Sequence, residues 1–171
     1  MKRKQKIFYV FAGRFPCEIA ISLFAAKSAE SFSNTDYPSI ILAPRRFRRS
    51  KERASDFYQT KNNYDVAFLP CIDLFQVPLL KRIAHHIVIT TFTLSSLVYL
   101  LVKAKSDDII YSNAHIPLFL LTFFFRNTFY EVHDFPEKKT GLYTSFFQRC
   151  RWILITNQWK EQKLIKKFKV S

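Results

Sequence analysis

Six short apolar runs, each followed by a segment of helical composition, constrain the fold of this chain more than any other feature. The runs lie at residues 6–12, 39–44, 65–70, 107–113, 128–134 and 152–157. Helical patterns occupy residues 18–32, 45–59, 78–105, 116–125, 144–151 and 159–168. Apolar strands that alternate with helices are typical of parallel sheets covered on both faces. We therefore predict an α/β fold: a doubly wound, mostly parallel, Rossmann-like sheet of about six strands with helices on both faces.

Glycine is so scarce that several large enzyme classes are excluded. Gly13 and Gly141 are the two glycines among 171 residues, whereas glycine makes up about 7% of average proteins. Neither a GxGxxG loop nor a GxxxxGK[ST] loop can be built, so P-loop hydrolases, protein kinases and standard dinucleotide dehydrogenases are excluded. Gly13 follows the first apolar run, where we expect either a close approach of the backbone or a positive φ.

Cysteine and histidine spacing predicts neither a disulfide framework nor a metal site. Cys17, Cys71 and Cys150 are odd in number and far apart, and no HExxH or CxxC pattern occurs. The basic start and the apolar run after it lack a small-residue cleavage site. We therefore expect one cytoplasmic domain over residues 1–171, since this length suits a single domain.

The chain carries a net charge of +14, and its basic residues gather toward the two ends. Residues 1–60 hold 12 basic and 5 acidic side chains, residues 61–140 hold 8 and 7, and residues 141–171 hold 7 and 1. The arginines of the densest run are Arg45, Arg46, Arg48 and Arg49. Such a patch attracts phosphates of nucleic acid, anionic lipid or a lipid pyrophosphate. An ordinary solvated face is the alternative interpretation.

Residues at the ends of the apolar runs are the candidate site, because ligands of doubly wound sheets bind outside the carboxyl ends of the strands. His133 is the most informative, since it ends a central run. Glu131 lies two residues earlier and faces the same side, so it either orients His133 or caps a helix. A buried histidine bonded to Asp134, and an ordinary turn at Asn113, are the structural alternatives.

Residues 83–102 form a 20-residue run without a formal charge, close to the ~20 residues that span a bilayer. The run also contains His85, His86 and several Ser and Thr residues, and the mean hydropathy of the whole chain is −0.06. We therefore favour a helix buried between the sheet and a neighbouring element. A membrane protein that spans at 83–102 is the alternative.

Four segments, spread nearly from end to end of the chain, resemble the N-terminal half of a family 4 type glycosyltransferase of the GT-B fold. They read KIFYVFAGRFP, DIIYSNAHIPLFLL, FYEVHDFP and RCRWILITNQWKEQKLIKKFKV. In that family the fifth strand segment ends in E-x-H-D or a close variant, and the closing segment contains I-T-x-x-x-K. Both patterns are present here.

The resemblance implies an acceptor-binding domain that faces a donor-binding domain across a cleft. It implies that Gly13 lies near the donor phosphates, at a helix N-terminus suited to anions. It also implies that His133 lies beside the transferred sugar as the catalytic residue. The other substrate-binding positions expected are Arg14, Asn113, Glu131, Asp134, Thr156 and Asn157.

The resemblance further implies a nucleotide sugar as co-substrate, no tightly bound cofactor, and a glycan or lipid-linked acceptor used in polysaccharide or glycolipid synthesis. The family's donor domain carries a glutamate pair seven residues apart, which these 171 residues lack. We therefore expect the chain alone to be inactive in retaining hexosyl transfer, as a truncated product or one half of a split enzyme completed by a second chain.

We expect the protein to be peripheral at the inner face of the cytoplasmic membrane, held there by anionic lipid. The alternative from another class is a basic nucleic-acid-binding module. It is less favoured, because the aromatic residues fall inside apolar runs rather than between basic residues, as a stacking platform requires.

Overall fold

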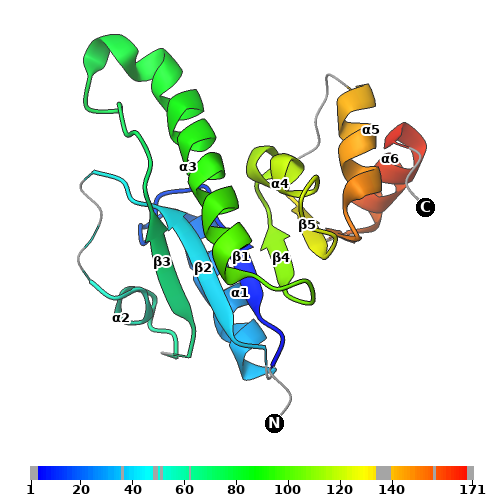
Figure 1. Ribbon diagram of the computed structural model, residues 1–171, viewed down its shortest axis with the longest axis horizontal. Helices are drawn as coiled ribbons and strands as arrows, with labels where there is room; N and C mark the ends of the chain where they lie inside the picture. Colours follow the sequence, from blue (N-terminus) through cyan, green and yellow to red (C-terminus); the bar gives the residue numbers. More distant parts are fainter. Residues whose placement is uncertain are drawn as a thin grey trace.

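The computed structural model is an α/β fold in which six parallel strands form one sheet (Figure 1). It describes residues 4–35, 37–47, 50, 52–61, 63–133, 140–155 and 157–168. The strands are β1 (Ile7–Val10), β2 (Ser39–Pro44), β3 (Asp65–Leu69), β4 (Ile109–Ser112), β5 (Thr128–Val132) and β6 (Trp152–Ile155). Their order is β3-β2-β1-β4-β5-β6, and every neighbouring pair is parallel. The predicted doubly wound, Rossmann-like sheet is confirmed.

Helices cover the two faces of the sheet in two groups. The helices are α1 (Ala20–Asn34), α2 (Ala54–Tyr58), α3 (Lys81–Lys103), α4 (His115–Leu121), α5 (Thr140–Arg149) and α6 (Gln158–Phe168), and the 3-10 turn η1 (Pro78–Leu80) precedes α3. Buried side chains of α1 and α2 form one core with the sheet, and those of α3 to α6 form the other. Figure 1 shows α1 behind the sheet and α3 in front of it.

The central strand β1 contributes to both cores, and all four of its residues are buried. Phe8 and Val10 pack toward the α3 side, whereas Ile7 and Tyr9 pack toward the α1 side. This follows from the alternation of side chains along a strand. An apolar run without alternation is therefore what a strand in this position requires.

The helix predicted over residues 45–59 is much shorter in the structure, where α2 spans Ala54–Tyr58. Upstream of it, the Arg45 amide donates to the Leu69 carbonyl at 2.7 Å and the Arg46 amide to the Pro44 carbonyl at 2.9 Å. The first bond continues the pairing of β2 with β3, and the second closes a tight local turn, so this part of the chain is not helical. The helix expected over residues 116–125 likewise ends early, at Leu121, and the one expected over 144–151 begins at Thr140.

The long apolar segment after β3 forms one α-helix, preceded by η1. By length and composition, Pro78–Lys103 could cross a membrane. Val88, Phe92 and Leu100 on one side of α3 nevertheless lie in the core, each at most 2% exposed. The helix therefore packs on the sheet along one side, as expected, but the expected burial of its other side is wrong, because Leu94, Val98 and Leu101 are exposed.

Asp108 joins β1 and β4 at the amino edge of the sheet. Its Oδ1 accepts a hydrogen bond from the Lys6 amide and its Oδ2 accepts one from the Lys105 amide, both at 2.9 Å. The residue is buried. The carboxylate therefore satisfies two backbone donors that have few alternatives once they are buried.

We expect Asp108→Ala to lower the free energy of unfolding by about 2–4 kcal/mol, because two amides lose their acceptor. Chemical denaturation followed by circular dichroism measures the change. The neighbouring Asp107 is exposed, so Asp107→Ala is the matched control and should change stability by no more than about 0.5 kcal/mol. Equal effects of the two substitutions would contradict this role for Asp108.

Candidate functional site

The carboxyl edge of the sheet is where a ligand of this fold binds, in the crevice at the topological switch point. The chain builds outward from β1 to β3 on one side and from β4 to β6 on the other, so the switch point lies between β1 and β4. The segments that leave these two strands, with the end of β5 beside them, contain most of the residues predicted from the sequence.

A buried carboxylate at the end of β5 holds a tyrosine and a histidine. The Tyr111 hydroxyl donates to Glu131 Oε2. Glu131 Oε1 lies 3.4 Å from His133 Nε2, an ion-pair distance without hydrogen-bond geometry. The Glu131 side chain is 7% exposed and that of His133 is 30% exposed. Glu131 thus contacts His133, as the two-residue spacing predicted, and the imidazole reaches the surface.

A second tyrosine packs against this cluster from β1. The Tyr9 ring lies edge-on to the Tyr111 ring, with 4.7 Å between the centroids, and the Phe24 ring meets His133 at 5.3 Å. Burial, and then the negative charge of Glu131, raise the pKa of Tyr9. Burial, together with the hydrogen bond to Glu131, raises the pKa of Tyr111. Both phenols therefore stay neutral, and Tyr111 remains a hydrogen-bond donor to the carboxylate.

Three polar atoms of this edge are buried without a hydrogen-bond partner among the described residues. They are Asn113 Nδ2, the Tyr9 hydroxyl and His133 Nε2. Next to Asn113, Ser112 Oγ donates to the Val10 carbonyl at 2.6 Å and accepts from the Ala114 amide at 3.0 Å. Ser112 thereby fixes the end of β4 against the end of β1 and holds Asn113 at the switch point. A buried donor without a partner is a position that a ligand can satisfy.

The backbone of the loop between β1 and α1 is held in place by hydrogen bonds from Ser22 and Tyr58. The Arg14 carbonyl accepts from Ser22 Oγ at 3.0 Å. The Tyr58 hydroxyl accepts from the Cys17 amide and donates to the Cys17 carbonyl, both at 2.7 Å. The Arg14 side chain is exposed. The backbone of the loop is therefore anchored, whereas the Arg14 guanidinium is left at the surface of the carboxyl edge.

Neither glycine has a positive φ, so backbone conformation does not require glycine at position 13. The nearby Phe11 side chain requires it instead. A Cβ at Gly13 would lie 2.6 Å from Phe11 Cζ and 2.8 Å from Phe11 Cε1. Phe11 is 2% exposed and packs edge-on against Phe15, so its ring has little room to move. Of the two explanations expected from the sequence, close approach holds, and the group that approaches is Phe11.

The ends of β5 and β6 are joined by a lysine that the sequence pattern did not single out. Lys160 Nζ donates to the His133 carbonyl at 2.9 Å and to the Val132 carbonyl at 3.3 Å. Asn157 Oδ1 accepts from the Lys160 amide at 2.9 Å and so caps α6. Asn157 therefore has a structural contact at this edge. Asp134 and Thr156, both predicted as substrate-binding, lie outside the described residues.

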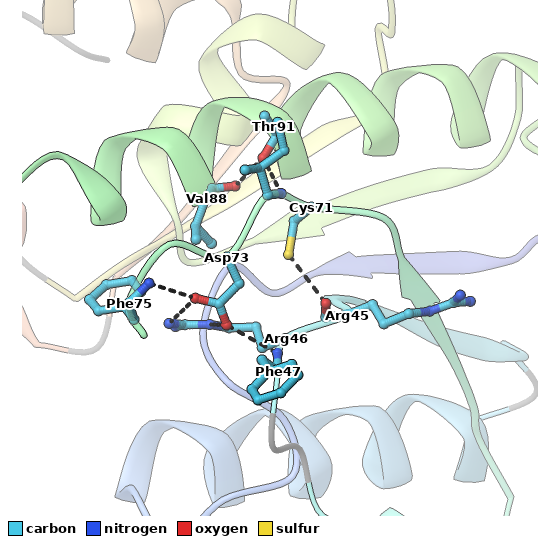
Figure 2. A network of polar contacts seen from close by, with 9 residues as sticks. Arg45, Arg46, Phe47, Cys71, Asp73, Phe75, Val88 and Thr91 are labelled. Carbon is cyan, nitrogen blue, oxygen red and sulfur yellow. Dashed lines mark hydrogen bonds and ion pairs between the residues drawn. The ribbon is translucent and has the colours of Figure 1, made fainter. Parts of the chain in front are cut away.

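The basic run after β2 contains an arginine that is already paired (Figure 2). The Arg46 guanidinium donates to both carboxylate oxygens of Asp73, at 3.1 and 3.3 Å, and its Cζ lies 4.3 Å from the centre of the Phe75 ring. Asp73 also accepts from the Phe47 and Phe75 amides. Arg46 thus links the loop after β2 to the loop after β3. Its guanidinium is already bound to the Asp73 carboxylate.

The other arginines of this run differ from Arg46. Arg45 is exposed, and its Nη2 donates to the Phe68 carbonyl at 3.3 Å. Arg48 and Arg49 lie outside the described residues. Of the four predicted anion-binding arginines, Arg45 is therefore the described one that presents its side chain to solvent. The pairing of Arg46 with Asp73 could not be predicted from the local sequence, because the two residues are 27 positions apart.

We expect Gly13→Ala to lower the free energy of unfolding by about 1–3 kcal/mol, because the new methyl group would overlap the buried Phe11 ring. Gly141→Ala is the matched control. No atom lies within 4 Å of a Cβ at Gly141, which is in α5, so this substitution should raise stability by about 0.5–1 kcal/mol. Thermal or chemical denaturation compares the two, and a Gly13→Ala protein as stable as the parent would contradict the packing.

The Asp73 carboxyl predicts a pH dependence of stability. Burial raises its pKa, but the hydrogen bonds from Arg46 and the two amides outweigh burial and leave the pKa lowered. A lowered pKa stabilises the fold above the pKa of the unfolded chain, about 4, and this contribution is lost as the pH falls through the folded pKa.

We therefore expect Asp73→Asn to cost about 1–3 kcal/mol at pH 7 and progressively less below about pH 4. Urea denaturation between pH 3 and 7 measures the difference. Asp107→Asn, on an exposed side chain, is the control. A cost for Asp73→Asn that does not change with pH would contradict the assigned ion pair.

No protein-family model matches the chain, and no curated protein matches it either. The features that bear on function are therefore the parallel sheet and the polar cluster at its carboxyl edge. Tyr9, which pattern alone did not select, belongs to that cluster together with Tyr111, Glu131, His133 and Asn113.

Proposed function

We propose that this chain is the acceptor-side half of a nucleotide-sugar-dependent glycosyltransferase. The observation that carries the proposal is the contact of Glu131 with Tyr111 and His133, with the unpaired amide of Asn113 on the neighbouring strand. Carbohydrate hydroxyls both donate and accept, so they match an amide, an imidazole and a carboxylate held close together. The sequence resemblance to family 4 type glycosyltransferases supports the same conclusion, because E-x-H-D supplies Glu131 and His133.

In this proposal His133 binds a hydroxyl of the transferred sugar and Glu131 positions it. Glu131 Oε1 lies 3.4 Å from His133 Nε2 and so faces the imidazole. The neutral Tyr111 hydroxyl holds the other carboxylate oxygen in place. Asn113 Nδ2 would donate to a second ligand oxygen from the end of β4. In this proposal the site therefore acts by binding and orienting the sugar.

Charge at the end of β1 fits the phosphates of a nucleotide sugar. Arg14 projects its side chain into solvent there, on a loop anchored by Ser22 and Tyr58. Transfer also needs donors that stabilise the departing diphosphate, and in the resembled family these come from the donor domain. We therefore propose that these 171 residues bind ligands but do not transfer sugar unless a donor-binding half is supplied.

His133→Ala and Asn113→Ala should each weaken ligand binding by about tenfold, because each loses a hydrogen bond to a buried or charged group. Saturation-transfer NMR with the purified chain measures binding across a panel of nucleotide hexoses and oligosaccharides. His85→Ala is the control, since it removes an exposed imidazole on α3 and should leave binding unchanged.

Two outcomes would contradict the proposal. One is that no panel member binds to the parent chain, or that His85→Ala weakens binding as much as His133→Ala. The other concerns inactivity: robust transfer or hydrolysis of a nucleotide sugar by the lone chain would show that these residues hold a complete active site.

A further inference from the structure

Helix α3 is apolar on two sides, but the sheet covers one of them. Val88, Phe92 and Leu100 are buried against the strands. On the outward side, Leu94 is 52% exposed, Val98 63% and Leu101 57%. A helix that is hydrophobic all round is normally covered all round, and an exposed apolar stripe of this kind marks an interaction surface.

Exposed apolar side chains occur on the outward side near both ends of the helix and in the turn before it. Ile83, Leu94, Val98 and Leu101 fall on one side at the spacing of a 3.6-residue helix, and all four are exposed. Leu79 in η1 is 91% exposed. In Figure 1 the first turns of α3 and the segment before them stand beyond the sheet, clear of the other elements. We call these five side chains the α3 stripe.

The charged residues nearest to the two ends of α3 along the sequence are basic. No acidic residue occurs from residue 74 to residue 106, whereas Lys81, Arg82, Lys103 and Lys105 flank the two ends of the helix. The preceding acidic residue, Asp73, is paired with Arg46. Basic residues at both ends of a helix with exposed apolar side chains fit a helix lying in the interface of an anionic bilayer.

We propose that the α3 stripe docks this protein on an anionic phospholipid bilayer, with α3 lying along the membrane surface. The leucine and valine side chains would enter the acyl boundary, while the lysines and Arg82 contact lipid phosphates. A spanning arrangement is disfavoured, because it would remove Val88, Phe92 and Leu100 from the core. The inference goes beyond sugar transfer, since it needs no donor or acceptor to be tested.

Co-sedimentation of the purified chain with vesicles tests the proposal. The parent should bind vesicles of phosphatidylcholine with 30% phosphatidylglycerol and bind pure phosphatidylcholine at least about tenfold more weakly, because each basic residue near an anionic surface adds to the affinity. Leu94→Glu and Val98→Glu should each weaken binding by about tenfold or more, since an apolar insertion is lost.

Leu23→Glu is the matched control, because Leu23 is also an exposed helical leucine but lies on α1, on the opposite face of the sheet. It should bind like the parent, and circular dichroism establishes that each variant is folded. Absence of vesicle binding by the parent, equal binding to both lipid mixtures, or equal loss in Leu23→Glu would overturn the proposal. Resistance to alkaline carbonate extraction would show a spanning helix instead.

Discussion

The requirement that β1 be buried on both faces determines most of this structure. Because side chains alternate along a strand, Phe8 and Val10 need one layer of helices and Ile7 and Tyr9 need another. The chain meets this requirement by placing α1 and α2 on one face and α3 to α6 on the other. The reversal between the two halves leaves the switch point beside β1, so the strand that organises the core also determines where a ligand can bind.

The two buried carboxylates show how this fold separates structural from functional charge. Asp108, at the amino edge, accepts from two backbone amides, and these donors are fixed once the sheet forms. Glu131, at the carboxyl edge, instead relies on the Tyr111 hydroxyl and on His133, whose side chain is partly exposed. A buried charge must be compensated, and compensation by a group at the surface leaves that group oriented for a ligand. The same chemical group therefore serves the fold at one edge and a candidate site at the other.

The strands and their direction could be predicted because a parallel strand that is buried on both faces appears in the sequence as a continuous apolar run. The pairing of Glu131 with His133 was equally local, since a two-residue spacing places them on one face. Other features depend on residues far apart in the chain. The register of β1 and β4 brings Tyr9 opposite Tyr111. The Arg46 pair with Asp73 holds residues 45–47 outside a helix, although the composition there favours one. Long-range contacts of this kind override local propensity, and no periodicity reports them.

The candidate site and the α3 stripe are related by the direction of the chain. Helix α3 begins where β3 ends, at the carboxyl edge, and it ends before β4 begins, at the amino edge. The turn with Leu79 therefore lies at the same end of the sheet as the segments that carry Arg14, Asn113 and His133. The polar cluster nevertheless faces the α1 side, because Tyr9 and Tyr111 belong to the core that α1 covers and the Phe24 ring of α1 meets His133. A bilayer on the outward side of α3 would lie on the opposite face of the sheet. The two proposals therefore assign opposite faces of the sheet, so that the apolar helix faces the membrane on one side and the strand ends present the hydrogen-bonding groups on the other.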